Sequence, residues 1–231
     1  MSANRGPPIP QVSLIGLFVT ALVAAQVTAA KLVAVSLPVS VPVTGDALLV
    51  PGAAFAYAVT FFASDCYAEL YGRRAAQVLV NVAFALNLVL LGLVRLAVAL
   101  PASGEGVGQA TFAAVLGPST GVVVGSLLAY LVSQNWDVFV FHELRTATEG
   151  RHLWLRNVVS TGTSQLLDTV IFILVAFKLF LGLPWPAVAS LIVGQYLLKL
   201  AIAVLDTPFV YLVVGAVRSR TDRADSLAYG R

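Results

Sequence analysis

Charged side chains interrupt several long apolar stretches of this 231-residue chain. The charges inside these stretches are Lys31, Asp65, Glu69, Arg95, Asp168, Lys178, Lys199 and Asp206, with Asp137 near the end of one stretch. If the stretches cross a membrane, each such charge costs at least about 2.5–3.5 kcal/mol at the bilayer centre. The chain can keep them only where they pair, face water or bind a ligand, so they are the first candidates for a functional site.

Helical geometry places these charges on narrow polar stripes. Successive residues of a helix are about 100° apart, so residues three, four and seven apart share one face. The stripes that result are Ser64, Asp65 and Glu69 with Tyr57; Ser126, Tyr130, Ser133 and Asp137; Thr161, Ser164, Gln165 and Asp168, in a helix that Asn157 begins; and Gln195, Lys199 and Asp206. Polar stripes in a bilayer turn away from lipid. Together they predict a polar cavity inside a helix bundle.

Of these charged residues, Asp168 is the one that a purely structural role explains least well. It lies near the middle of its apolar segment, one helical turn from Gln165. Lys199 also lies near mid-segment, but Asp206 is two turns further along the same helix, about 10 Å away and beyond direct contact. Pro208 lacks a backbone donor and therefore predicts a kink next to Asp206. A carboxylate beside a broken helix is typical of a ligand or ion site in a membrane protein.

Other charges have simpler interpretations. Arg95 and Lys178, like Lys31, lie near the outer ends of their segments, where long basic side chains can reach the membrane interface. Asp137 could cap its helix and meet Arg145. These alternatives leave Asp168 as the strongest single candidate.

The composition supports the membrane interpretation. The chain is 59% hydrophobic and only 11% charged, whereas an average soluble domain is roughly 25% charged. A bilayer core about 30 Å thick needs roughly 20 apolar residues for each helical span. We therefore exclude a soluble enzyme, a nucleic-acid-binding protein and a disordered chain.

The pattern of apolar segments predicts an all-α integral membrane protein, a bundle of six transmembrane helices. The expected spans lie at about residues 11–37, 51–70, 75–100, 109–141, 157–181 and 187–217. Residues 1–10 and 218–231 form polar ends outside this domain of 11–217. Loops are expected around Pro38, Pro42, Gly45 and Asp46, and over the charged residues 142–156.

The basic residues of the expected loops and ends fall on one side of this topology. They are Arg5, Arg73, Arg74, Arg145, Arg151, Arg156, Arg218, Arg220, Arg223 and Arg231. The opposite loops carry only Asp46 and Glu105. Because cytoplasmic loops are enriched in Lys and Arg, we expect both termini in the cytoplasm of a cell-membrane protein. The net charge of +3 is then a topology signal, and no nucleic-acid partner is expected.

Cysteine and histidine usage excludes several chemistries. Cys66 is the single cysteine, so an internal disulfide and Cys-pair redox chemistry are excluded. Both histidines, His142 and His152, lie in the charged loop, away from the serines of the spans. We therefore expect no catalytic residues, no metal site and no cofactor, and the chain has no phosphate-binding motif for ATP hydrolysis.

Four segments together resemble the motifs of the queuosine precursor transporter family, also called the VUT family. They are ASDCYAELYGRR at 63–74, QNWDVFVF at 134–141, RNVVST at 156–161 continuing through QLLDT at 165–169, and QYLLK at 195–199 with DTP at 206–208. The resemblance covers about residues 15–215. It implies a six-helix membrane protein that imports 7-deazaguanine precursors, preQ0 and preQ1, for queuosine or archaeosine in tRNA.

A guanine-like ligand would suit the polar stripes. Its N1–H and exocyclic amino group are donors, which one carboxylate can accept together. We expect Asp168 with Gln165 and Asn157 to meet this edge, and Lys199 with Asp206 to compensate charge. Further substrate contacts are expected from Gln195, Asp65, Glu69 and Tyr57, with stacking by Tyr57, Phe61 or Phe172.

Two other functions remain open at this point. One is a substrate-capture subunit of an ATP-driven uptake complex for a vitamin-like molecule, docking through the small-residue stripe Ala21, Ala25 and Ala29. The same stripe could instead mediate helix packing or a homodimer. An intramembrane enzyme is disfavoured, because the expected serine–histidine and paired-aspartate motifs are missing.

Overall fold

The structure is a computed structural model that describes residues 7–41, 44–149 and 153–229. Its elements follow the chain in this order: α1 (Ile9–Thr28), β1 (Leu32–Val41), β2 (Gly45–Pro51), α2 (Ala54–Tyr71), α3 (Arg73–Ala99), α4 (Gln109–Leu116), α5 (Ser119–Ala147), α6 (Leu153–Ile173), η1 (Leu174–Phe180) and α7 (Trp185–Tyr229). The η1 segment is a π-helical continuation of α6. The fold is mostly helical, as predicted.

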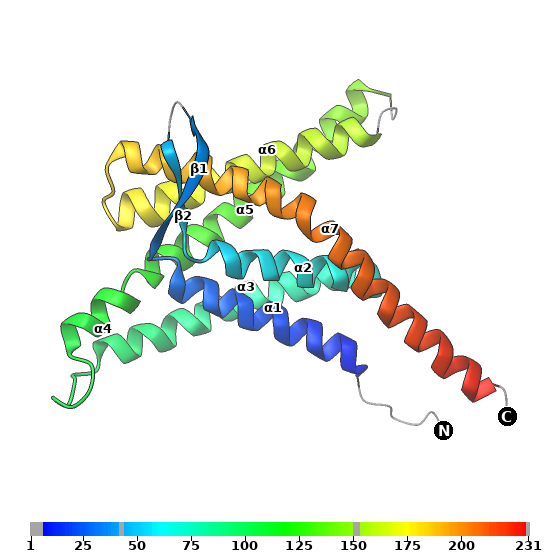
Figure 1. Ribbon diagram of the computed structural model, residues 1–231, viewed down its shortest axis with the longest axis horizontal. Coiled ribbons are helices and arrows are strands. Elements are labelled where there is room, and N and C mark those ends of the chain that lie inside the picture. Colours follow the sequence, from blue (N-terminus) through cyan, green and yellow to red (C-terminus); the bar gives the residue numbers. More distant parts are fainter. Residues whose placement is uncertain (1–6, 42–43, 150–152, 230–231) are drawn as a thin grey trace.

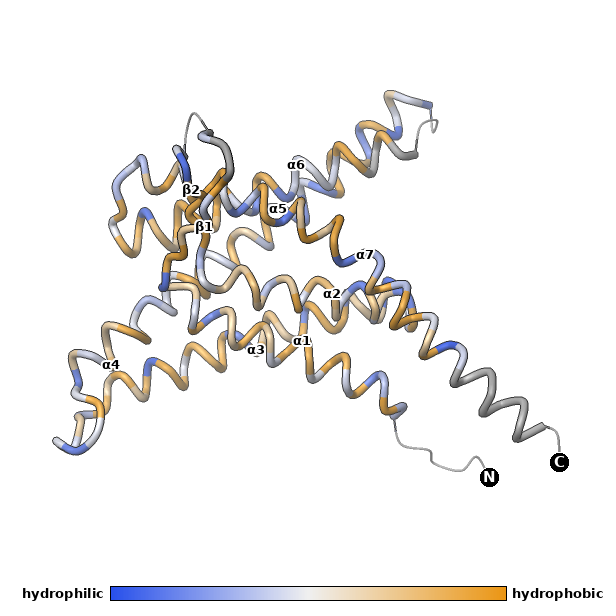
Figure 2. Tube along the Cα trace, in the orientation of Figure 1, coloured by the Kyte–Doolittle hydropathy of each residue, from blue (hydrophilic) through white to orange (hydrophobic). Residues whose placement is uncertain are grey.

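Within the described ranges, five stretches are long and apolar enough to cross a membrane. They are Ile9–Thr28, Arg73–Ala99, Gln109–Ala147, Val158–Phe180 and Trp185–Ser219. Figure 2 shows apolar residues along most of these helices, with hydrophilic residues in the loops and also within α5, α6 and α7. The expected second span corresponds to α2, which has 18 residues and carries Asp65 and Glu69. Its crossing of the membrane stays a prediction.

The predicted first helix, 11–37, is too long. Helix α1 ends at Thr28, and the following residues form β1, which pairs antiparallel with β2. The run Leu32–Val35 contains β-branched valines, which favour extended backbone, and Pro38 cannot continue a helix. A short apolar run does not by itself distinguish a strand from a helix. Pro51 consequently ends β2 instead of beginning a helix, and α2 begins at Ala54.

The later segment boundaries also differ from the expected ones. The predicted span 109–141 is two helices, α4 and α5, separated at Gly117 and Pro118, and α5 continues to Ala147. The charged loop is therefore shorter than 142–156. Helix α7 continues through Pro208 and into the predicted tail, as far as Tyr229.

The helices form two packed groups, and α1 and α7 contact helices of both groups. In Figure 1, α1, α2 and α3 lie together, while α5 and α6 form an adjacent pair crossed by the first part of α7. One end of the molecule holds the start of α1, the later part of α7, the end of α2, the end of α5 and the start of α6 (Figure 1). The β1–β2 hairpin and α4 lie toward the other end. The hairpin packs against α7 through β2.

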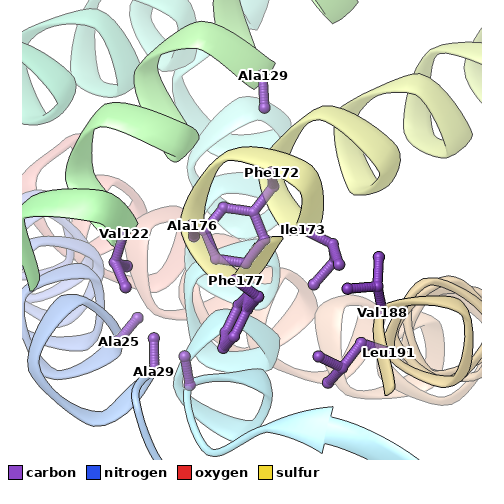
Figure 3. Close-up of a cluster of buried hydrophobic side chains, with 11 residues drawn as sticks. Ala25, Ala29, Val122, Ala129, Phe172, Ile173, Ala176, Phe177, Val188 and Leu191 are labelled. Carbon is purple, nitrogen blue, oxygen red and sulfur yellow. The ribbon is translucent and has the colours of Figure 1, made fainter. Parts of the chain in front are cut away.

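One core cluster lies where η1 meets α1, α5 and α7. Its buried residues are Ala25, Ala29, Ala53, Val122, Ala129, Phe172, Ile173, Ala176, Phe177, Val188 and Leu191 (Figure 3). A second cluster joins α1, α2, α3 and the later part of α7 around Phe18, Cys66, Leu79 and Val214. At Gly125 on α5, an added Cβ would lie 3.3 Å from the Phe172 carbonyl oxygen. Glycine there lets α5 approach α6 closely, beside the polar stripes.

Candidate functional site

A cavity of about 180 Å³ lies between α1, α2, α3, α5, α6 and α7. Its walls are mixed: aromatic and aliphatic side chains from several helices surround a smaller set of amides, hydroxyls and one pair of opposite charges. The lining residues are Phe18, Leu22, Tyr57, Thr60, Phe61, Ser64, Val80, Phe84, Ser126, Ala129, Tyr130, Ser133, Gln134, Gln165, Asp168, Phe172, Gln195 and Lys199. All four predicted polar stripes contribute to it.

An ion pair between α6 and α7 forms one wall of the cavity. Lys199 Nζ donates to Asp168 Oδ2 at 2.6 Å, and the Lys199 and Asp168 side chains are 13% and 27% exposed. Ser133 Oγ on α5 donates to the other carboxylate oxygen, Asp168 Oδ1, at the longer distance of 3.5 Å. Lys199 thus extends across to α6, whereas Asp206 lines a different pocket. The charge-compensating role expected of Lys199 together with Asp206 stays a prediction.

Gln195 brings an unused hydrogen-bond acceptor to the same cavity. The residue is 6% exposed, and its Oε1 atom has no hydrogen-bond partner among the described residues. A buried amide oxygen without a partner costs about 1–3 kcal/mol, so a ligand N–H that reached it would recover that cost. Gln165, one turn before Asp168, and Gln134 add further amides to the lining.

Tyr57 closes the cavity from α2. Its hydroxyl lies 3.2 Å from Ser126 Oγ on α5, which links the two helices. Its ring lies 6.4 Å from that of Phe61, centroid to centroid. Thr60 and Ser64, which also line the cavity, donate their hydroxyls to the carbonyls of Tyr57 and Phe61. Their oxygens therefore present acceptor capacity to a ligand.

A stacked aromatic pair forms the wall between α3 and α5. The rings of Phe84 and Tyr130 lie 4.4 Å apart at an angle of 16°. The Tyr130 hydroxyl donates to Asn81 Oδ1 at 2.5 Å and accepts from Gln77 Nε2 at 2.6 Å. Sequence reasoning placed Tyr130 on a polar stripe but missed Phe84, since an apolar aromatic in an apolar helix gives no signal of its own.

Three predicted carboxylates line a separate crevice. Asp65, Glu69 and Asp206 lie there with Arg73 and Arg218, in a crevice of about 380 Å³ between α2 and α7. Arg218 Nη2 donates to the Glu69 carbonyl at 2.8 Å and lies 3.6 Å from its carboxylate. Consecutive helical residues point about 100° apart, so Ser64 faces the cavity while Asp65 faces the crevice.

The predicted site residues therefore separate into two groups. Tyr57, Gln165, Asp168, Gln195 and Lys199 come together at the cavity, whereas Asp65, Glu69 and Asp206 gather at the crevice. The side chain of Asn157 lies outside the described residues.

Charges with simpler interpretations also have observed partners. Asp137 accepts a hydrogen bond from Ser164 on α6 at 3.3 Å, which ties α5 to α6 outside the cavity. Lys178 donates to the Leu183 carbonyl at 2.9 Å and lies 4.9 Å from the centroid of the Trp185 ring. The Lys178 contacts hold the turn between η1 and α7 in place.

The small-residue stripe of α1 is internal to the chain. Ala21 is 7% exposed, and Ala25 and Ala29 are fully buried against neighbouring helices. Small side chains allow close helix approach. The stripe therefore serves packing within the chain, and it is not an open surface for a partner.

Comparison with known proteins gives two matches. The family model described as "Putative vitamin uptake transporter" matches residues 51–213. This range contains α2 to η1, the first part of α7, and most residues that line the cavity and the crevice. A protein of Bacillus subtilis (strain 168) named "Probable queuosine precursor transporter" is 34% identical over 157 residues, which cover 67% of each chain. No solved structure matches.

Proposed function

We propose that this chain, which belongs to the vitamin uptake transporter family, is a membrane transporter that imports a 7-deazaguanine precursor of queuosine. The observation that carries the proposal is the cavity among the long apolar helices, where aromatic walls face the Asp168–Lys199 pair. A flat heterocycle with several N–H groups needs apolar faces above and below its ring and acceptors at its edge. The cavity offers both.

The edge of the base would meet acceptors on α6 and α7. Among the described residues, Asp168 Oδ1 has only the long contact with Ser133, so it can accept one N–H of a guanine-like edge. Gln195 Oε1, which lacks a partner among the described side chains, accepts the second. Gln165 lies one turn from Asp168 and can bind a ring carbonyl or nitrogen. Phe61, Phe172 and the Phe84–Tyr130 pair provide faces for stacking.

The acidic crevice would serve substrate passage. It lies between α2 and α7, next to the end of α2. That end lies toward the side of the molecule that holds the start of α1 and the later part of α7 (Figure 1). Asp65, Glu69 and Asp206 can accept the donors of a base there, between the cavity and that side. The role of Asn157 in base reading remains a proposal of the sequence alone.

The topology proposed for transport has six crossings, with α2 as the sixth, and both termini in the cytoplasm. The start of α1, the later part of α7 and the ends of α2 and α5 support it, since all lie toward one end of the molecule (Figure 1). Arg73 and Arg145 mark that end, as the positive-inside rule requires. The β1–β2 hairpin would then lie on the outer side.

Uptake of labelled preQ0 by cells that depend on salvage tests the function. We expect Asp168→Asn to reduce uptake strongly, because the neutral amide presents one acceptor where the carboxylate presents two. The matched control is Asp137→Asn, which changes an intramembrane carboxylate that lies outside the cavity. Unchanged uptake by the Asp168 variant would exclude its role in base reading.

Reconstitution distinguishes transport by this chain alone from transport with an ATP-driven complex. Proteoliposomes that contain only the purified chain are expected to accumulate labelled preQ0. Accumulation that required added ATPase subunits would replace the proposed mechanism by substrate capture.

A further inference from the structure

We infer that the cavity selects electrically neutral 7-deazaguanines and discriminates against those that carry an ammonium group. This inference rests on the proposed function and narrows its substrate class. PreQ0 has a neutral nitrile at position 7, whereas preQ1 has an aminomethyl group that is positively charged at neutral pH. The two compounds share the guanine-like edge, so the surroundings of the substituent decide between them.

The charges that line the cavity cancel one another. Asp168 and Lys199 are the only acidic and basic side chains among its described lining residues. They contact each other at 2.6 Å, so the carboxylate already has its cation. The remaining lining groups are aromatic rings, aliphatic chains, hydroxyls and amides. An empty cavity of this composition has no net charge.

A cationic ligand would disturb this balance. It would bring an additional charge into a partly buried site without a free carboxylate, or it would have to displace Lys199 from Asp168. Charges removed from water need a partner of opposite sign, and separating a buried pair is strongly unfavourable. A neutral ligand keeps the ion pair intact while it uses Gln195 Oε1 and the aromatic walls.

The carboxylates that could compensate an ammonium group lie elsewhere. Asp65, Glu69 and Asp206 line the crevice on another face of α2, and none of them lines the cavity. That crevice also contains Arg73 and Arg218, which offset part of its negative charge. The sequence predicted substrate contacts by Asp65 and Glu69, but both residues line the crevice and neither lines the cavity.

Competition binding to the purified full-length protein tests the inference. Labelled preQ0 is displaced by preQ0, by preQ1 and by 7-hydroxymethyl-7-deazaguanine, which matches preQ1 in size but is neutral. We expect the hydroxymethyl compound to compete almost as well as preQ0, and preQ1 to compete at least about tenfold less well. Equal competition by preQ1 would overturn the inference while the proposed function stands. Weak competition by both substituted compounds would also overturn it, since size and not charge would then decide.

Charge variants provide the second measurement. Lys199→Gln removes the cation and leaves Asp168 free, so the preference for the neutral compounds is expected to fall or reverse. Lys199→Gln combined with Asp168→Asn makes the cavity neutral again and should restore the preference. The matched control is Lys178→Gln, a lysine that binds the Leu183 carbonyl outside the cavity. The preference is a ratio of affinities within one variant, so a uniform loss of active protein cancels.

The outcomes separate the two proposals. A preference that is the same in Lys199→Gln and in the wild-type protein would overturn the selection by charge. Failure of the wild-type protein to bind any of the three compounds would overturn the proposed function, and this inference with it.

Discussion

Lys199 Nζ on α7 lies 2.6 Å from Asp168 Oδ2 on α6, and the pair forms part of the cavity wall. The contact has two consequences. It fixes α7 against α6 at the middle of the bundle, and it occupies one oxygen of the carboxylate that sequence reasoning assigned to the ligand. Ser133 on α5 approaches the other oxygen, so three helices converge on Asp168.

Removal of one partner of this pair should cost more stability than removal of both. Asp168→Asn or Lys199→Met leaves the other charge partly buried without its partner. Loss of one partner of a fully buried pair costs 3–5 kcal/mol; here the side chains keep some exposure, so we expect a loss below about 3 kcal/mol for each single variant. The double variant should recover most of it. Thermal unfolding in detergent measures all three, and additive losses would contradict direct coupling.

Asp168 could be predicted from the sequence, but its partner could not. A carboxylate in a long apolar segment is conspicuous, and helical periodicity placed Gln165 on the same face. The partner lies 31 positions away on another helix, and which face of α7 meets α6 depends on packing. Sequence reasoning therefore considered only Asp206, on the same helix as Lys199, and it could not separate the cavity from the crevice.

The β1–β2 hairpin is a second feature that could not be predicted from the sequence. Residues 32–41 are as apolar as the helix before them, so composition alone extended the first span through Leu37. Whether such a run becomes a strand depends on a partner, and β2 supplies one. The overall helical membrane architecture was predictable because it depends on segment length and hydropathy, which do not require knowledge of contacts.

The Phe84–Tyr130 stack should contribute to binding and stability through different atoms. Tyr130→Phe keeps the ring on Phe84 but removes the hydroxyl that bonds Asn81 and Gln77. We expect a loss of about 1 kcal/mol in unfolding free energy, with preQ0 affinity nearly unchanged. Tyr130→Ala removes the ring as well and should weaken preQ0 binding. Thermal unfolding and equilibrium binding of each variant measure the two effects. If Tyr130→Ala bound preQ0 as tightly as the wild-type protein, stacking on this wall would be excluded.

Gly194 on α7 should tolerate no side chain. An added Cβ would collide with the Leu49 carbonyl oxygen of β2, which is backbone and cannot rotate away. Gly194→Ala is therefore expected to destabilise the protein by roughly 1–3 kcal/mol and to shift the hairpin. The matched control on the same helix is Gly215→Ala, where an added Cβ meets nothing within 4 Å. That control should be neutral or slightly stabilising, because alanine favours helix. Thermal unfolding compares them, and a stable Gly194 variant would contradict the close approach of β2 to α7.

The proposed orientation predicts which loops a membrane-impermeant reagent can reach. Cys66 is the single cysteine and is buried, so Cys66→Ala gives a background free of thiols. In that background, Ser103→Cys introduces a thiol at an exposed position between α3 and α4, and Glu143→Cys introduces one at an exposed position near the end of α5. The positive-inside rule places Ser103 outside the cell and Glu143 in the cytoplasm, next to Arg145. A charged maleimide added to intact cells should therefore label the cysteine at 103 alone, and both cysteines should react after the cells are permeabilised. Labelling of 143 in intact cells, with protection of 103, would reverse the orientation and place both termini outside.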